Sequence, residues 1–233
     1  MNAAGVRPVL TVRRARGELR AAALVLHGGA EHGLDRVRPW RAAYLRMVPF
    51  ARALASAYGD LGLDVHLLRN RVRGWNEPDR DPVTDARWAL ERIRATAPGM
   101  PIVLVGHSMG GRVALRIADA DGVAAVCALA PWTPEGEPVE PVRDRTVLIA
   151  HGSGDERTSP AASLAYATRA APVAARLARV EIAGERHAML RRPGLWRRLV
   201  LDATARALTL PGAVDAFDRV WCDPAPGRLS ISL

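Results

Sequence analysis

The sequence contains no lysine, because all 33 residues of its Lys+Arg total are arginine. Cysteine and aromatic residues are also scarce, with two cysteines and 5% aromatics in 233 residues. The cysteines, Cys127 and Cys222, form no spaced framework, and Cys127 lies in an apolar run typical of a core. No group of histidines and cysteines has metal-ligand spacing. These absences exclude a disulfide-rich scaffold and predict no metal site.

Long hydrophobic runs are absent as well. No apolar stretch approaches the roughly 18 residues of a membrane span. The first ten residues lack the basic and apolar regions of a signal peptide. We therefore expect a cytoplasmic protein with no stable membrane insertion.

The charge is strongly basic, with a formal net charge of +9. The arginines are scattered from Arg7 to Arg228 and occur in pairs at most, without a basic run interleaved with aromatic residues. Nucleic-acid binding is not indicated by this pattern. The charge supports only a mild attraction for anionic substrates or surfaces.

What is present is the composition of an ordinary globular protein, with 49% hydrophobic and 24% charged residues. Apolar strand patterns alternate with helical patterns along the chain, which predicts an α/β fold with a mostly parallel sheet and helices on both faces. We expect a single domain over residues 1–233 with a core at about 8–208. The tail, 211–233, carries Val214, Phe217 and Trp221 for docking, but the sequence does not place it.

The motif that organises the chain is Gly106-His107-Ser108-Met109-Gly110-Gly111. A buried strand is predicted before it, at 101–105, and a helix after it, with Gly122 ending that helix. A serine in G-x-S-x-G between a strand and a helix is typical of a nucleophile elbow. The turn is so tight that a Cβ on either outer glycine would collide with its neighbours, so Ser108 is the candidate nucleophile.

A serine hydroxyl needs an imidazole to accept its proton. His187 follows the last predicted strand, at 177–183, in a loop that can reach over the end of the sheet. His32 is the alternative base. His66 lies mid-strand and is assigned a structural role. His27 and His151 end strands whose next residue is glycine, and elbow geometry points His107 away from Ser108, so these three are not chosen as the base.

The imidazole in turn needs a carboxylate to orient it. Asp155 follows the strand at 146–150 in a glycine-containing loop, whereas the segment after the strand at 123–129 has no acid before Glu135. The predicted order is therefore Ser108, Asp155, His187, and chance agreement with the serine–acid–histidine order of hydrolases is improbable.

An oxyanion hole needs two donors aimed at the developing charge. The N–H of Met109 opens the elbow helix and supplies one. The second is expected from the loop His27-Gly28-Gly29-Ala30, with Gly29 as the first choice and Ala30 as the second. A plain strand-ending turn is the alternative interpretation of that loop.

With these residues in place, the sequence resembles an α/β-hydrolase-fold serine hydrolase over residues 8–208, most closely the monoacylglycerol-lipase-like and serine-aminopeptidase-like branch. The resemblance rests on the loop at 27–32 and the elbow at 106–111. It implies an acyl-enzyme mechanism on Ser108 with no metal and no cofactor. That branch carries a lid domain where this chain has only residues 132–145, so we expect little or no cap.

The leading hypothesis is therefore a serine esterase acting on a small-molecule ester. Acyl transfer or thioester hydrolysis by the same triad, and a non-catalytic ligand-binding protein, remain alternatives. Trp40, Trp75 and Trp132 lie in loops predicted to flank the groove and are the candidate substrate-binding residues. Packing against the base of its loop is the alternative role of each. A shallow pocket covers few carbons, so acyl groups of about two to six carbons are expected to be the best substrates.

Overall fold

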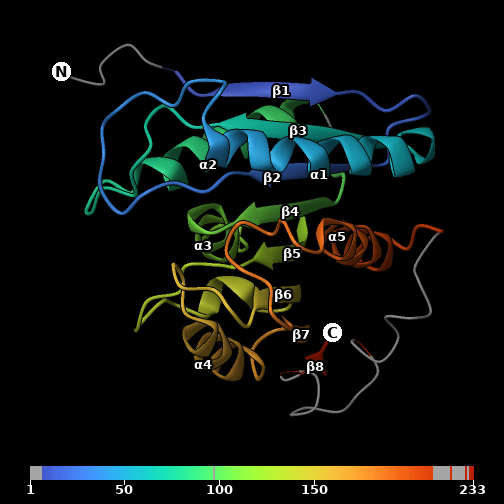
Figure 1. The fold of residues 1–233 in the computed structure, drawn as a ribbon. Helices are drawn as coiled ribbons and strands as arrows, with labels where there is room; N and C mark the ends of the chain where they lie inside the picture. The colour runs from blue at the N-terminus through green and yellow to red at the C-terminus, as the bar shows by residue number, and fades with distance from the viewer. Residues whose placement is uncertain (1–6, 97, 212–220, 222–228, 230) are drawn as a thin grey trace.

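The computed structural model describes residues 7–96, 98–211, 221, 229 and 231–233. Its centre is an eight-stranded sheet in the order β1-β3-β2-β4-β5-β6-β7-β8 (Figure 1). Only β1 runs antiparallel to its neighbour β3; the other pairs are parallel. The strands are β1 Val9–Arg13, β2 Ala21–Leu26, β3 Leu63–Arg69, β4 Ile102–His107, β5 Val123–Leu129, β6 Thr146–Gly152, β7 Arg176–Ile182 and β8 Ile231–Ser232.

Helices cover both faces of this sheet, as the sequence predicts. Helices α1 and α5 pack on one face, and α2, α3 and α4 pack on the other (Figure 1). The helices are α1 Ala42–Tyr58, α2 Asp81–Thr96, α3 Met109–Arg116, α4 Pro160–Ala170 and α5 Pro193–Ala207, with 3-10 turns at Gly59–Leu61 and Glu140–Val142.

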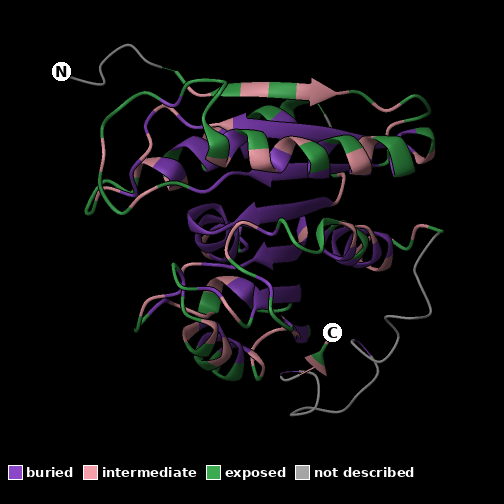
Figure 2. Ribbon diagram, viewed as in Figure 1, coloured by how far each residue is buried: buried purple, intermediate pink, exposed green. Residues whose placement is uncertain are grey.

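The central strands are buried on both faces, and β2 shows how two cores arise from one strand (Figure 2). Ala21, Ala23 and Val25 belong to the apolar cluster beneath α1 and α5. The intervening residues of the strand, 22, 24 and 26, belong to the cluster beneath α2, α3 and α4. Successive side chains of a strand point to opposite faces, so a continuous apolar run supplies both layers at once.

One predicted helix end is wrong. The elbow helix ends at Arg116, well before Gly122. α1 ends at Tyr58, and the backbone continues through Gly59, whose φ is −60°, as a 3-10 turn to Leu61. Gly62 ends that turn with φ 93°, a left-handed conformation that favours glycine.

Part of the tail joins the sheet. β8 pairs with β7 through Ile231 and Ser232, and Trp221 is buried in the cluster that α5 covers. The predicted docking residues Val214 and Phe217 lie outside the described residues. In the described part of the chain, no helix combines the length and hydrophobicity that crossing a bilayer requires.

Candidate active site

Ser108 stands between β4 and α3 with φ 56° and ψ −120°. Such a conformation is rare for a residue other than glycine. A Cβ on Gly106 would come within 2.1 Å of the Gly110 carbonyl oxygen, and one on Gly110 within 2.5 Å of the Leu26 carbonyl oxygen. The two outer glycines of the motif are therefore required by close backbone approach, as predicted.

The three residues selected from the sequence meet at this turn. His187 Nε2 lies 3.1 Å from Ser108 Oγ, and His187 Nδ1 lies 2.7 Å from Asp155 Oδ2. Because the carboxylate can only accept, Nδ1 carries the proton and donates it to Asp155. Nε2 is then free to accept the hydrogen bond of the serine hydroxyl.

Asp155 is buried under several donors. Its carboxylate accepts the backbone N–H of Arg157 at 2.8 Å and of Thr158 at 3.0 Å, and the Thr158 hydroxyl lies 2.9 Å away. Burial by itself would raise the pKa of Asp155. Hydrogen bonds from His151, His187 and these two amides outweigh it and hold the pKa well below its usual range. The carboxylate is therefore ionised at neutral pH.

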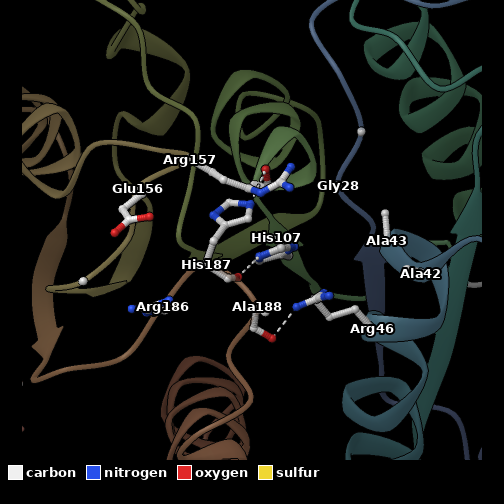
Figure 3. A pocket seen from close by; sticks show the side chains of 13 residues that line it. Gly28, Ala42, Ala43, Arg46, His107, Glu156, Arg157, Arg186, His187 and Ala188 are labelled. Atoms are coloured by element: carbon white, nitrogen blue, oxygen red, sulfur yellow. Dashed lines mark hydrogen bonds between the residues drawn. The ribbon is translucent and has the colours of Figure 1, made fainter.

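The loop that carries His187 is held by contacts with His107 and Arg46. The His107 ring lies 4.7 Å from the His187 ring, and its Nε2 donates to the His187 carbonyl oxygen at 2.9 Å. Burial, together with the charge of His187, lowers the pKa of His107 to about 3, so the imidazole stays neutral. Arg46 of α1 donates to the carbonyl oxygen of Ala188 (Figure 3). These contacts fix the base over the serine.

A family model described as an alpha/beta hydrolase domain matches residues 68–146, a stretch that contains the elbow but neither Asp155 nor His187. Solved structures superpose on the rest of the sheet as well. XC6422 from Xanthomonas campestris, described as an α/β serine hydrolase without a lid, has a TM-score of 0.64 at 20% identity, covering 88% of this chain and 90% of its own. This chain has the α/β-hydrolase fold.

Two further solved structures show a similar likeness. Est1E from Butyrivibrio proteoclasticus has a TM-score of 0.67 at 17% identity over 89% of this chain and 97% of its own. Esterase 2 from Thermogutta terrifontis, phosphonylated by cyclosarin, has a TM-score of 0.66 at 18% identity over 91% of this chain and 92% of its own. A search of curated protein sequences gives no significant match.

No lid is built between β5 and β6. Residues 131–145 are all described, and their only helical segment is the 3-10 turn at Glu140–Val142. The minimal cap expected for this fold is thus observed. Ser108 lines two open pockets.

The larger hollow, the main pocket, has a volume of about 470 Å³ and borders Ser108 and His187 on the side of α1 (Figure 3). The smaller one, the side pocket, has a volume of about 220 Å³ and lies toward Met109 and Trp132. Both volumes suit small ligands rather than long chains.

The two candidate oxyanion donors flank Ser108. Met109 opens α3, where first-turn N–H groups have no partner inside the helix. Gly29 lines both pockets, and a Cβ there would meet the Arg73 carbonyl oxygen at 2.3 Å. The alternative donor Ala30 is excluded, because its N–H bonds to the Arg73 carbonyl oxygen at 2.9 Å. Gly29 is left as the candidate from this loop.

Of the three tryptophans predicted to contact substrate, only Trp132 lines a pocket that borders Ser108. Trp75 is wrong as a contact residue: it is 1% exposed and packs edge-on against Trp132. The guanidinium carbon of Arg112 lies over both rings, 3.8 Å from the centroid of Trp75 and 4.4 Å from that of Trp132. Trp40 is also wrong, since it is 69% exposed and stacks with Arg38 outside the pockets.

The rejected candidates lie elsewhere. The His32 side chain is 76% exposed beside Glu31, and Glu135 is exposed, so neither takes part in the triad network. His151 was not chosen as the base, and its fully buried Nε2 lies 3.3 Å from Asp155 Oδ2, on the acid rather than on the nucleophile.

Sequence reasoning did not select Thr158, Arg46 or Arg157, which support or line the site. The signal for Thr158 is its position three residues after Asp155, where an aspartate can cap the following turn. No sequence pattern points to the arginines, because one comes from a helix face and the other from a loop.

Proposed function

We propose that this chain is a serine hydrolase that cleaves carboxylic esters of small to medium acyl groups through an acyl-enzyme on Ser108. The observation that carries the proposal is the continuous hydrogen-bond chain from Ser108 through His187 to Asp155, open to a pocket on the nucleophile's side. An ionised carboxylate, a neutral imidazole and a serine in this order are the parts that acyl transfer requires.

In the first half of the reaction, Ser108 Oγ attacks the ester carbonyl carbon while His187 Nε2 takes the hydroxyl proton. Asp155 stabilises the imidazolium that forms and keeps its ring oriented. The tetrahedral intermediate collapses, the C–O bond to the alcohol breaks, and His187 returns the proton to the leaving oxygen.

The amides of Met109 and Gly29 stabilise the oxyanion in this scheme. Each such donor is worth about 2.7–4 kcal/mol in the transition state. In the second half, His187 takes a proton from a water molecule as the water oxygen attacks the acyl carbon. The bond from that carbon to Ser108 Oγ then breaks, His187 returns the proton to Oγ, and the acid is released.

The size of the acyl group follows from the open pockets. Without a lid, a long chain stays largely in water and gains little beyond the about 0.8 kcal/mol of each covered methylene. Esterase 2 from Thermogutta terrifontis, one of the structural neighbours, is named for ester hydrolysis, which is consistent with this chemistry.

The test combines covalent labelling with turnover. The purified protein is expected to react with a fluorophosphonate probe and to hydrolyse short p-nitrophenyl esters. Ser108→Ala should abolish labelling and lower kcat by about 10⁶ while leaving the thermal midpoint close to that of the unsubstituted protein. Thioester substrates assayed in parallel show whether Ser108 is acylated faster by an ester or by a thioester. Turnover near that of the unsubstituted protein in Ser108→Ala would contradict the proposal.

A further inference from the structure

The main pocket contains an unusual charge arrangement. Three arginines line it from three different elements: Arg46 from α1, Arg157 from the loop after β6, and Arg186 from the loop after β7 (Figure 3). Glu156 is the one acidic residue of the lining. Cationic groups therefore outnumber carboxylates directly beside the proposed nucleophile.

These guanidinium groups have no carboxylate partner within the described residues. None of the three arginines forms an ion pair there, whereas the deeper Arg112 and Arg116 both pair with Glu137 at 2.6 Å. Arg46 is half-buried, and its one hydrogen-bond acceptor in the described part of the chain is the carbonyl oxygen of Ala188. Its pKa is lowered by burial and by the positive charge of Arg157. Two cations thus face one pocket and repel each other.

Arg157 is placed to act on both sides of the nucleophile. It borders the main pocket and the side pocket, and its backbone N–H is fixed to Asp155 at 2.8 Å. The backbone is therefore tied to the triad, while its exposed side chain has no hydrogen bond among the described residues.

We propose that the ester substrate carries a second, anionic group, a carboxylate or a phosphate, which Arg157 binds with Arg46 as the supporting charge. This inference rests on the proposed ester hydrolysis. A guanidinium binds planar or tetrahedral oxyanions through two parallel N–H bonds. An anion between the two arginines also removes their mutual repulsion. The anionic group takes no part in the bonds that form and break.

Matched substrates test the proposal. On the alcohol side, 4-acetoxybenzoate is compared with its neutral methyl ester; on the acyl side, mono-4-nitrophenyl adipate is compared with its methyl ester. We expect at least one anionic member to have a kcat/KM about tenfold higher or more, as one hydrogen bond to a charged group provides. 4-Acetoxyphenyl phosphate forms a third arm, and a further gain with it identifies phosphate as the group recognised.

Arg157→Gln should lower the ratio of anionic to neutral kcat/KM about tenfold. Arg52→Gln is the matched control, since Arg52 is an exposed arginine of α1 that does not line the pockets, and it should leave that ratio unchanged. Raising the ionic strength should also reduce the ratio of the unsubstituted protein, because salt screens the exposed part of the interaction.

The outcomes separate this inference from the proposed function. Equal kcat/KM for both members of both pairs, or an equal ratio in Arg157→Gln and Arg52→Gln, overturns the anion site while Ser108-dependent hydrolysis stands. Hydrolysis that persists in Ser108→Ala overturns the proposed function itself, whatever the substrate preference.

Discussion

The triad and the rim of the main pocket lie within one hollow, but they are held in different ways. Asp155 accepts several buried hydrogen bonds, and the loop of His187 is fastened through His107 and Arg46. At the rim, the side chain of Arg157 forms no hydrogen bond or ion pair among the described residues. The chemistry therefore depends on the packed interior, whereas substrate choice depends on side chains that the fold constrains little. The two should respond differently to substitution.

The largest expected effect is on the triad acid. Asp155→Asn keeps the shape of the side chain but removes the charge that orients and stabilises His187, so kcat should fall by up to about 10⁴. Ester turnover at saturating substrate measures it, and thermal unfolding reports whether the fold is kept. Glu135→Gln is the control, because Glu135 is the exposed acid that the sequence left as an alternative. A dead Glu135→Gln beside an active Asp155→Asn would reverse the assignment.

Two buried histidines, His27 and His107, should lower the free energy of unfolding in acid. Burial lowers the pKa of His27 to about 4 and that of His107 to about 3, against about 6.5 in the unfolded chain. As the pH falls below 6.5, only the unfolded chain takes up these protons, so stability decreases until about pH 4 for the part due to His27 and about pH 3 for the part due to His107. Each histidine contributes up to about 1.4 kcal/mol per pH unit in that window.

Denaturant unfolding at pH 6 and pH 5 measures this slope. The contacts of His27 explain why the folded protein does not take up this proton. Its Nε2 accepts the N–H of Asn70 at 3.1 Å, so a proton on Nε2 would face that donor. His27→Gln should therefore reduce the slope, whatever it does to stability at pH 7. His32→Gln, at an exposed position, should leave the slope as it is.

A smaller effect is expected at the support of the acid. Thr158→Val keeps the volume of the side chain but removes the hydroxyl that lies 2.9 Å from Asp155 Oδ2, and kcat should fall about tenfold. Thr168→Val is the matched control, on an exposed position of α4. Equal activity of the two variants would show that the interior network is less important than its geometry indicates.

The smallest effects should come from the outer tryptophans. The kcat/KM of p-nitrophenyl esters should peak at acyl lengths of about two to six carbons, because methylenes beyond the pocket stay in water and add no binding free energy. Trp132→Ala should change the relative kcat/KM values of these esters several-fold, because Trp132 lines the side pocket. Trp40→Ala should leave the profile unchanged, because Trp40 is exposed and lines neither pocket. An optimum at twelve carbons or more would show that a cover forms over the pocket.

The same division explains what the sequence could predict. The elbow, the order of the triad and the strand–helix alternation rest on local rules, namely glycine spacing, strand ends and apolar periodicity. Trp75 and Trp40 were assigned from their loops alone, and burial of one and exposure of the other depend on packing between distant segments. The Ala30 amide likewise could not be excluded without seeing the Arg73 carbonyl that occupies it.

The cluster of Trp75, Arg112 and Trp132 has a consequence for how this pocket can change. The backbone N–H of Trp132 is bonded to the Ser108 carbonyl oxygen at 3.1 Å, so the wall of the side pocket is linked directly to the nucleophile. A bulkier substrate cannot displace the Trp132 ring without separating it from Arg112, whose guanidinium also lies over the Trp75 ring. Replacing one ring to widen the side pocket therefore also removes a contact of the other, and the paired substitutions Trp75→Leu and Trp132→Leu should show strongly non-additive free energies of unfolding.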